Sequence, residues 1–511
     1  MKKQILTTVL LLSTLLAAQM SLTANAADDG EGLLLISPKP DTVNTQTANA
    51  VDDTFLSSQY EQYAGMYSYE GVALQLNSVD MLLGGGNGGF DLYNLPDRQQ
   101  ASVMVVRMRG EEEAAKAAYE AGEITCPFSD VDNWAKPYVA WLYEKGITQG
   151  IGEGLFGNRI CSAQEYVTFM LRALGYSVTW AEEESTDVLY ADVMEFASAL
   201  GVWDEYLAYE PDFNRGVMSA VTYQALAADV KNTDDRLLYS LTQSGAIDAE
   251  KASPILALYD RIDTAAALER ASVPVSEGLR LNGTVLQKED LVYSVIGLPE
   301  GDYHEALISS LLFDVGIDLT GETPQLALNG EITSESPNLN STIPVGLWLH
   351  DGSVYLDVMG LKTKETLADS AVMSSFSPLF GDLFDDLYDS APRYYAITDV
   401  EIAVSDGTDG SAAGTTITYD MTDYMWQIAA ISAGTEAFTE NAGLWVSIIN
   451  EMYIDEDGIL SWASDNMYAL ISEAYADGTV FSAEVLLQTA VSYTAWGNDA
   501  TLTYPDFSQF E

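Results

Sequence analysis

Carboxylates dominate the side chains that could do chemistry in this sequence. The chain has 77 Asp and Glu residues, but only two histidines, His304 and His350, and two cysteines, Cys126 and Cys161. A facing pair of carboxylates can hydrolyse a glycosidic bond, yet the sequence singles out no such pair. No serine, cysteine or lysine lies in a recognisable nucleophile motif. We therefore expect a protein that is not an enzyme.

Metal and phosphate sites are not indicated either. Cys126 and Cys161 show no metal-site spacing, so we assign them no zinc; they either form one disulfide or remain free buried thiols. The acidic residues between 382 and 389 lack the glycine-centred loop of an EF-hand, and a solvated helix face is the better interpretation. The glycine loop at 150–154 matches no dinucleotide or P-loop pattern. We expect no cofactor and no metal.

The charge balance excludes one class of partner. With 22 basic residues the formal net charge is −55 at pH 7, which would repel phosphate backbones, so we exclude nucleic-acid binding. An apolar content of 48% is normal for a globular protein, and 511 residues leave room for several domains. We interpret the acidity as a source of solubility outside the cell.

The first 26 residues have the pattern of an export signal. Lys2 and Lys3 precede an apolar stretch at 5–18, and Ala24-Asn25-Ala26 offers small residues for cleavage. The alternative, a short membrane anchor, is weaker because the stretch is too short to span a bilayer comfortably. We expect a signal peptide at 1–26, a linker at 27–54, a secreted mature chain and no transmembrane segment.

Three related segments follow, best aligned at 81–110, 141–177 and 196–226. In each, an apolar helix-like stretch leads into a turn, an aromatic residue, a polar cap and a second apolar helix. We place the repeat boundaries at 55–125, 126–186 and 187–250. A helix–loop–helix unit cannot bury its apolar face alone, so the three should pack on one another.

Local signals in each copy set where the helices begin. In the first helix of the second copy, apolar residues recur at helical spacing, namely Trp134, Tyr138, Trp141 and Leu142. Ser162 with Glu165 forms a capping box that should start the second helix. Asp97 with Gln100 plays the same part in the first copy, and Asn214 is the expected cap in the third.

The second copy resembles an S-layer homology domain. The similar motifs are Phe128–Val131 (FSDV), Trp134-Ala135, Gly146–Gly150 (GITQG), Phe156 and Arg172–Gly175 (RALG). The first copy is similar through its glycine-rich loop, Phe90 and residues 107–110, and the third mainly at 213–216 and 225–226. The resemblance implies a pseudo-threefold helical unit, a place on the cell surface or in the cell wall (the S-layer), and binding to envelope polysaccharide, often bearing acidic pyruvyl groups.

The resemblance also implies site residues. The family's second helix starts with Thr-Arg-Ala-Glu, whose arginine faces the sugar and whose planar fork suits a carboxylate. The first copy keeps the arginine as Arg98, the second has Ala163 there but keeps the glutamate, and the third offers Arg215. The implied polysaccharide-binding residues are Arg98, Arg215, Asp130, Trp134 and Glu165. Trp134 could face a sugar, but at helical spacing we favour a core position for it.

Beyond residue 250 the pattern changes from helical to strand-like. We expect a linker over 251–285, with helical periodicity to about Leu268 and a break at 272–276. Asn329-Gly330 and Asp351-Gly352 are two-residue hairpin signals. A helix is predicted from Ser461 to Ala476, before a closing strand from Glu484 to Thr494. This is an α+β pattern built on an antiparallel sheet.

Residues 286–511 resemble the curved half-barrel domains of LolA/LppX-type lipoproteins. The similar segments are short, namely 327–332 (ALNGEI), 355–362 (YLDVMGLK), 454–458 (IDEDG) and 502–508 (LTYPDFS). The resemblance implies a curved antiparallel sheet with helices, and a concave apolar face that holds a lipid or peptide. The alternative is a wholly packed core. The expected fold is thus multidomain: an all-α pseudo-threefold trimer of repeats, then this α+β domain.

The functional hypothesis is a non-catalytic, secreted surface protein. Its repeats would anchor it non-covalently to envelope polysaccharide, and its C-terminal domain would bind an apolar ligand or partner. One alternative is an anchored cell-wall glycan hydrolase, which would need facing carboxylates about 5–10 Å apart. The other is a structural S-layer subunit with a self-complementary face.

Overall fold

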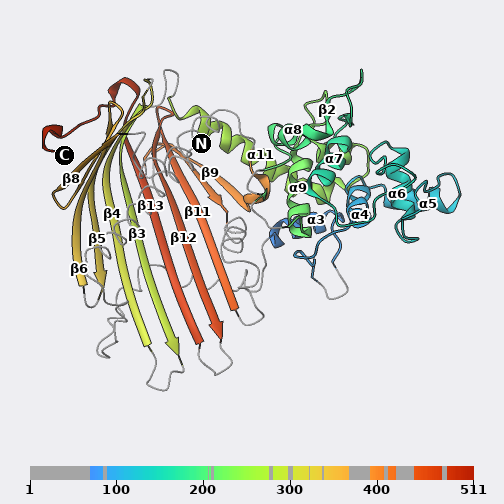
Figure 1. Ribbon diagram of the computed structural model, residues 1–511, viewed down its shortest axis with the longest axis horizontal. Coiled ribbons are helices and arrows are strands. Elements are labelled where there is room, and N and C mark those ends of the chain that lie inside the picture. Colours follow the sequence, from blue (N-terminus) through green and yellow to red (C-terminus); the bar gives the residue numbers. More distant parts are fainter. Residues whose placement is uncertain are drawn as a thin grey trace.

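A computed structural model of the chain shows a group of helices beside a broad curved sheet (Figure 1). The structure describes residues 69–84, 89–204, 207–208, 212–274, 280–296, 303–321, 323–336, 339–366, 392–407, 412–421, 442–474 and 480–510. The expected signal peptide and the acidic run at 382–389 lie outside these residues. Within them, no helix is both long enough and apolar enough to cross a membrane.

The N-terminal part of the described chain is helical. Its elements are α3 (Glu70–Ser78), α4 (Arg98–Met108), α5 (Glu112–Glu120), α6 (Lys136–Glu144), α7 (Ala163–Ala173), β1 (Val178–Thr179), β2 (Val188–Leu189), η2 (Tyr190–Asp192), α8 (Val193–Ala199), α9 (Arg215–Ala227), α10 (Leu237–Gln243) and α11 (Ala249–Ala271). The two short strands pair in parallel. Helix α11 ends close to where the helical periodicity of the sequence ends.

The predicted caps start the second helix of each copy. Asp97 and Gln100 form a complete capping box at α4, and Ser162 and Glu165 form another at α7. At α9, the side chain of Asn214 accepts a hydrogen bond from the Val217 amide at 2.9 Å. Each cap satisfies amide groups that the first turn of a helix leaves without a partner. These three predictions are confirmed.

The three copies close into a ring. Helix α4 contacts α6, α7 contacts α8, and α9 contacts α3, so the second helix of each copy packs on the first helix of the next. Hydrogen bonds follow the same order: Gln99 Nε2 donates to Asp132 at 3.1 Å, and Gln164 Nε2 donates to the Tyr190 carbonyl at 2.6 Å. The Gly216 amide returns to the first copy, at the Leu92 carbonyl, at 2.9 Å. This cyclic order is the expected pseudo-threefold unit.

The ring encloses a continuous apolar core. Side chains from all three copies are fully buried in it, among them Leu76, Met108, Leu142, Met170 and Leu226. Burying one such side chain stabilises a fold by about 1.5–3 kcal/mol. No single helix pair could supply this core, which is why the copies fold as a set.

Among the residues that the structure describes, the C-terminal part is an antiparallel sheet of eleven strands. They are β3 (Arg280–Ile296), β4 (Tyr303–Asp318), β5 (Gln325–Ser336), β6 (Leu339–His350), β7 (Ser353–Val358), β8 (Leu361–Thr366), β9 (Asp399–Ser405), β10 (Gly414–Asp420), β11 (Ala442–Asp455), β12 (Leu460–Ala474) and β13 (Val480–Trp496). Their order is β8-β7-β6-β5-β4-β3-β13-β12-β11-β10-β9. The two ends, β8 and β9, do not pair, so the sheet is curved but not closed (Figure 1).

The two faces of the sheet differ in character. Val285 is 2% exposed and pairs with Phe313 on one side and Val491 on the other, both buried. The next residue, Leu286, points to the opposite face and is 45% exposed. This alternation is what a strand with one buried face requires.

The C-terminal segment covers part of the outer face. Turns η6 (Gly497–Asp499) and η7 (Phe507–Gln509) follow the last strand. The ring of Phe507 stacks on Tyr355 with a centroid distance of 3.8 Å, and Phe510 packs edge-on against Trp348 at 5.8 Å. These contacts bury the two aromatic residues of β6 and β7.

Two predictions for the C-terminal half were wrong. The predicted helix from Ser461 to Ala476 is strand β12, which pairs with β11 and β13 along its length, because tertiary pairing overrides the helix-favouring side chains. Asn329-Gly330 is not a hairpin but lies within β5. A Cβ on Gly330 would lie 1.9 Å from the Leu312 carbonyl oxygen, so this glycine serves a close approach of backbones.

Two others were confirmed. Asp351 and Gly352 connect β6 to β7, and their φ angles of 47° and 71° are those of a two-residue hairpin turn. The closing strand predicted from Glu484 to Thr494 lies within β13.

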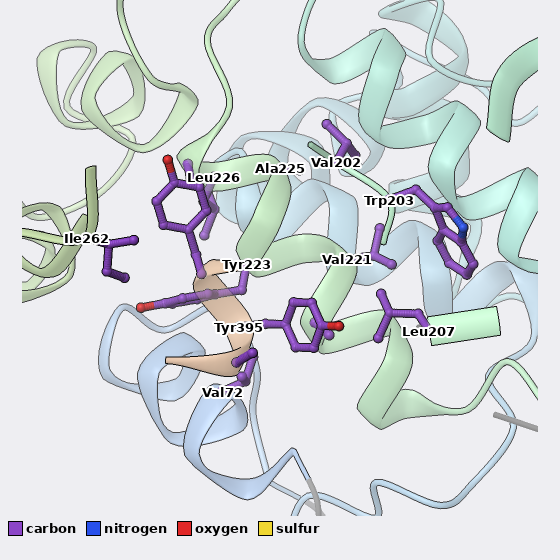
Figure 2. Packing of buried hydrophobic residues seen from close by; sticks show 14 of the residues in the cluster. Val72, Val202, Trp203, Leu207, Val221, Tyr223, Ala225, Leu226, Ile262 and Tyr395 are labelled. Atoms are coloured by element: carbon purple, nitrogen blue, oxygen red, sulfur yellow. The ribbon is translucent and has the colours of Figure 1, made fainter. Parts of the chain in front are cut away.

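A segment that precedes β9 joins the two parts of the molecule. The turn η4 (Tyr394–Ala396) contacts α9, and Tyr395 is 2% exposed among side chains of the helical core, near Tyr223 and Leu207 (Figure 2). The Tyr395 hydroxyl donates to Asp204 at 2.9 Å. On α11, Arg261 Nε donates to the Val400 carbonyl of β9 at 3.1 Å.

Candidate functional site

The predicted site residues Arg98 and Glu165 meet where the first copy contacts the second. Arg98 is the first residue of α4, and its guanidinium forms an ion pair with the Glu165 carboxylate of α7. Each side chain is only 6% exposed. The guanidinium also lies over the ring of Phe156, at 4.8 Å from its centroid. Arg98 is therefore neutralised and held inside the junction.

A second guanidinium binds the same carboxylate from the surface. Arg159 Nη2 lies 2.7 Å from Glu165 Oε1, and Nη1 lies 2.8 Å from Oε2, which is a bidentate pair. The Arg159 side chain is 56% exposed. Two guanidinium groups on one carboxylate leave the group of three with one excess positive charge. Sequence reasoning missed Arg159, although it stands only three residues before the Ser162 cap.

The electrostatics of this group favour the ionised carboxylate. Burial alone would raise the pKa of Glu165, but the hydrogen bond from Arg159 and the charge of Arg98 lower it below its ordinary value. The Glu165 carboxylate raises the pKa of Arg159 in turn. The Glu165 carboxylate and the Arg159 guanidinium are therefore both charged at neutral pH.

Asp130 braces the loop of the second copy. Its carboxylate accepts hydrogen bonds from the amides of Phe156, Gly157 and Asn158 at 2.6, 2.8 and 3.0 Å. Burial opposes ionisation, but these three donors lower the pKa of Asp130. The carboxylate thus shapes the loop that leads to Arg159.

Trp134 is not a core residue, and the favoured interpretation of its spacing was wrong. It precedes α6 and is 51% exposed, while Tyr138 and Leu142 of that helix fill the core. The reason is local: the chain turns at 132–135 before the helix begins. Gln99 of α4 holds this turn, because its Oε1 accepts the Asp132 amide at 2.7 Å. Trp134 is thus an exposed aromatic residue beside the helix that begins with Arg98.

Arg215 occupies the matching place in the third copy. It is the first residue of α9, and its Nε donates to the Phe90 carbonyl of the first copy at 3.0 Å. The side chain is half-buried, and burial lowers its pKa. The equivalent first residue of α7 is Ala163. The structure therefore places Arg98 and Arg215 at two separate junctions between copies.

The two cysteines are free thiols. Cys161 is buried, and burial raises its pKa to about 12, so the thiol stays protonated. Cys126 is partly buried, and burial raises its pKa as well. Of the two alternatives for this pair, the structure shows the unpaired state.

A polar cavity lies where the helices meet the turn η4. Its volume is about 720 Å³, and its walls come from α9, α10, α11 and Tyr394. Arg236 lies in the wall and forms an ion pair with Asp260 at 2.9 Å.

Among the residues that the structure describes, no group of His, Cys, Asp or Glu side chains is arranged to hold a metal ion.

Comparison with known proteins identifies the second copy. Residues 127–157 match the S-layer homology domain, and this stretch holds Asp130, Trp134 and the loop up to the residues before Arg159. Such a domain points to the cell surface or envelope and to attachment to cell-wall polysaccharide. A search of curated protein sequences found no match.

Solved structures show only distant similarity. LprF from Mycobacterium bovis is 11% identical, with a TM-score of 0.23, over 48% of this chain and 97% of that one. A LolA superfamily protein from Nitrosomonas europaea is 9% identical, with a TM-score of 0.11, over 48% of this chain and 96% of that one. The chain thus resembles LprF and LolA-type folds, but only distantly.

Proposed function

We propose that the helical unit anchors an exported protein to an acidic polysaccharide of the cell envelope, and that the junction of the first two copies provides the contact. One observation carries this proposal: Arg98 and Arg159 share the carboxylate of Glu165, and Arg159 is 56% exposed. The buried arginine balances the glutamate. Arg159 already uses one N–H of each terminal nitrogen on Glu165, so the edge formed by Nε and Nη2 is the side left for an external carboxylate.

The charge of the whole chain makes this surface cation distinctive. A net charge of −55 repels an acidic polymer at long range, so attraction must come from local contacts. A planar guanidinium can bind a sugar carboxylate through two hydrogen bonds. Trp134, exposed at the same junction, adds an apolar surface for a sugar ring.

The first test compares Arg159→Gln with the unchanged protein. Co-sedimentation of the full mature chain with purified envelope polysaccharide should show about 10–100-fold weaker binding, the loss expected for one charge-assisted contact. Lys251→Gln is the matched control, because Lys251 is a half-exposed cation on α11 that pairs with Asp80. Equal binding by the unchanged protein and Arg159→Gln would contradict the proposed contact.

We propose further that the protein has no catalytic activity. The function of the anchor needs only charge and shape at a junction between copies, and no reacting group takes part in it. Incubation of the protein with cell-wall glycan should release no reducing sugar. Release that disappears on substitution of a pair of carboxylates would favour the hydrolase alternative.

For the C-terminal sheet we propose a binding role for an apolar ligand or partner. The supporting observation is that one face of the unclosed sheet carries apolar side chains from neighbouring strands, including Val285, Val315, Leu328 and Leu347, all of which lie in one buried apolar cluster. If a ligand is held there, native mass spectrometry of the purified chain should detect a bound lipid or peptide, and organic extraction should remove it. A ligand-free chain that also fails to bind a fluorescent fatty acid would favour the fully packed alternative.

A further inference from the structure

A second aromatic feature lies between the second and third copies. Strands β1 and β2 pair in parallel, with Val178 opposite Val188 and Thr179 opposite Leu189. The next residues along each strand are Trp180 and Tyr190. Parallel pairing in this register therefore brings the two rings side by side, although ten residues of chain separate them.

The two rings stack, and one of them faces solvent. Their centroids are 4.1 Å apart, with an angle of 30° between the ring planes. Trp180 is 70% exposed, whereas Tyr190 is partly buried. Single exposed apolar side chains are common on protein surfaces, so exposure alone marks no site. What distinguishes Trp180 is the stacked ring of Tyr190 behind it. The stack holds the indole in one orientation before any ligand arrives.

The backbone around Trp180 is also fixed. The Thr179 hydroxyl donates to the Ala181 carbonyl at 2.8 Å and lies 2.8 Å from the Thr186 hydroxyl. Asp187 accepts the Ser177 amide at 2.6 Å and pairs with Lys231 at 2.7 Å. The platform is therefore built on a braced loop.

Tyr190 connects the platform to the charged junction. Its carbonyl accepts Gln164 Nε2 at 2.6 Å, just as Gln99 holds the turn that carries Trp134. Burial and then the nearby charge of Glu165 raise the pKa of Tyr190, while Arg98 and Arg159 oppose them. The aromatic stack thus adjoins the group that contains the exposed guanidinium.

We infer that Trp180, supported by Tyr190, is a stacking platform for a neutral sugar ring of the same polysaccharide whose acidic group binds at Arg159. The inference rests on the proposed anchoring function. Ala181 follows Trp180, and the next three residues, Glu182 to Glu184, are exposed carboxylates. They would repel an acidic sugar at this end of the site. One end of the site therefore selects charge, and the other selects the apolar face of an uncharged ring.

The test is Trp180→Ala in the full mature chain, with binding to purified envelope polysaccharide measured by titration calorimetry. Loss of one aromatic contact should weaken binding about two- to tenfold. Trp180→Phe should retain most of the affinity, because a ring remains. Leu361→Ala on strand β8, where the side chain is 76% exposed, is the control and should bind unchanged.

A second polysaccharide sample separates this inference from the anchoring proposal. Chemical reduction of its carboxyl groups should abolish the effect of Arg159→Gln but leave the effect of Trp180→Ala. If the unchanged protein binds and Trp180→Ala binds equally well, the platform is overturned while anchoring stands. If the unchanged protein binds neither sample, the anchoring proposal is wrong, and the platform inference that rests on it is overturned as well.

Discussion

Arg98 and Glu165 form a buried ion pair across the junction of two repeats, although 67 residues separate them in the chain. Arg98 belongs to the first repeat and Glu165 to the second, so neither repeat alone contains both members of the pair. Since a buried charge is costly unless it is paired, each repeat needs the other for its charged residue to be tolerated. The pair thus fixes which copy lies beside which.

The first prediction concerns the stability of this junction. Glu165→Gln leaves the Arg98 guanidinium buried without a counter-charge, and we expect the free energy of unfolding to fall by about 3–5 kcal/mol. Urea denaturation followed by circular dichroism measures it. Glu113→Gln is the control, because the Glu113 side chain is 90% exposed and should contribute little. A small effect of Glu165→Gln would mean that water reaches the pair.

The second prediction concerns acid stability. Burial alone would raise the pKa of Glu112, but hydrogen bonds from Arg107, Lys116 and Tyr138 lower it from 4.5 to about 2. Because the folded-state pKa lies below the unfolded value, the stabilisation is complete above about pH 4.5 and is lost as the pH falls towards 2. Glu112→Gln should flatten the stability profile in this window, and identical profiles would contradict it. Acid titrations monitored by tryptophan fluorescence provide the comparison.

The third prediction tests a helix cap. Asn214→Ala removes the acceptor for the Val217 amide, so we expect a loss of about 1 kcal/mol in unfolding free energy. Asn214→Ser, which restores an acceptor, should recover most of it. Thermal denaturation of the three proteins distinguishes a cap from a side chain that merely fills space, for which serine would be no better than alanine.

The fourth prediction separates two glycines of the sheet. Gly330→Ala would force a methyl group against the Leu312 carbonyl oxygen of the neighbouring strand, with an expected cost of about 1–3 kcal/mol or more. At Gly352 nothing lies within 4 Å of an added Cβ, but φ is 71°, so Gly352→Ala should cost only about 1 kcal/mol. Denaturant midpoints of the two variants provide the ranking, and the reverse order would contradict the close approach at Gly330.

Signals carried by a few adjacent residues could be predicted from the sequence. The caps at Asp97, Ser162 and Asn214 depend only on side chains three positions apart, and the turn at Asp351-Gly352 depends on two residues. In each of these interactions the two partners lie within three positions of each other in the sequence. The sequence pattern and the structure therefore agree at such places.

Features that depend on distant partners could not be predicted in this way. Strand β12 has helix-favouring residues, and only its pairing with β11 and β13 makes it a strand. Arg159 shares the Glu165 carboxylate with Arg98, which lies in another repeat. The turn that exposes Trp134 is held by Gln99, which also lies in the first repeat. Each of these features depends on a contact with a segment far away in the sequence, so a short stretch of sequence cannot reveal it.

The turn η4 gives the molecule a mechanical property. The chain leaves the helical unit through α11, forms half of the sheet, and touches the helices again at Tyr395 before it completes the sheet. Force applied to the sheet would reach the repeats along two routes at once, through the covalent chain and through the bonds of Tyr395 and Arg261. A load on the sheet is therefore shared between the covalent chain and these contacts.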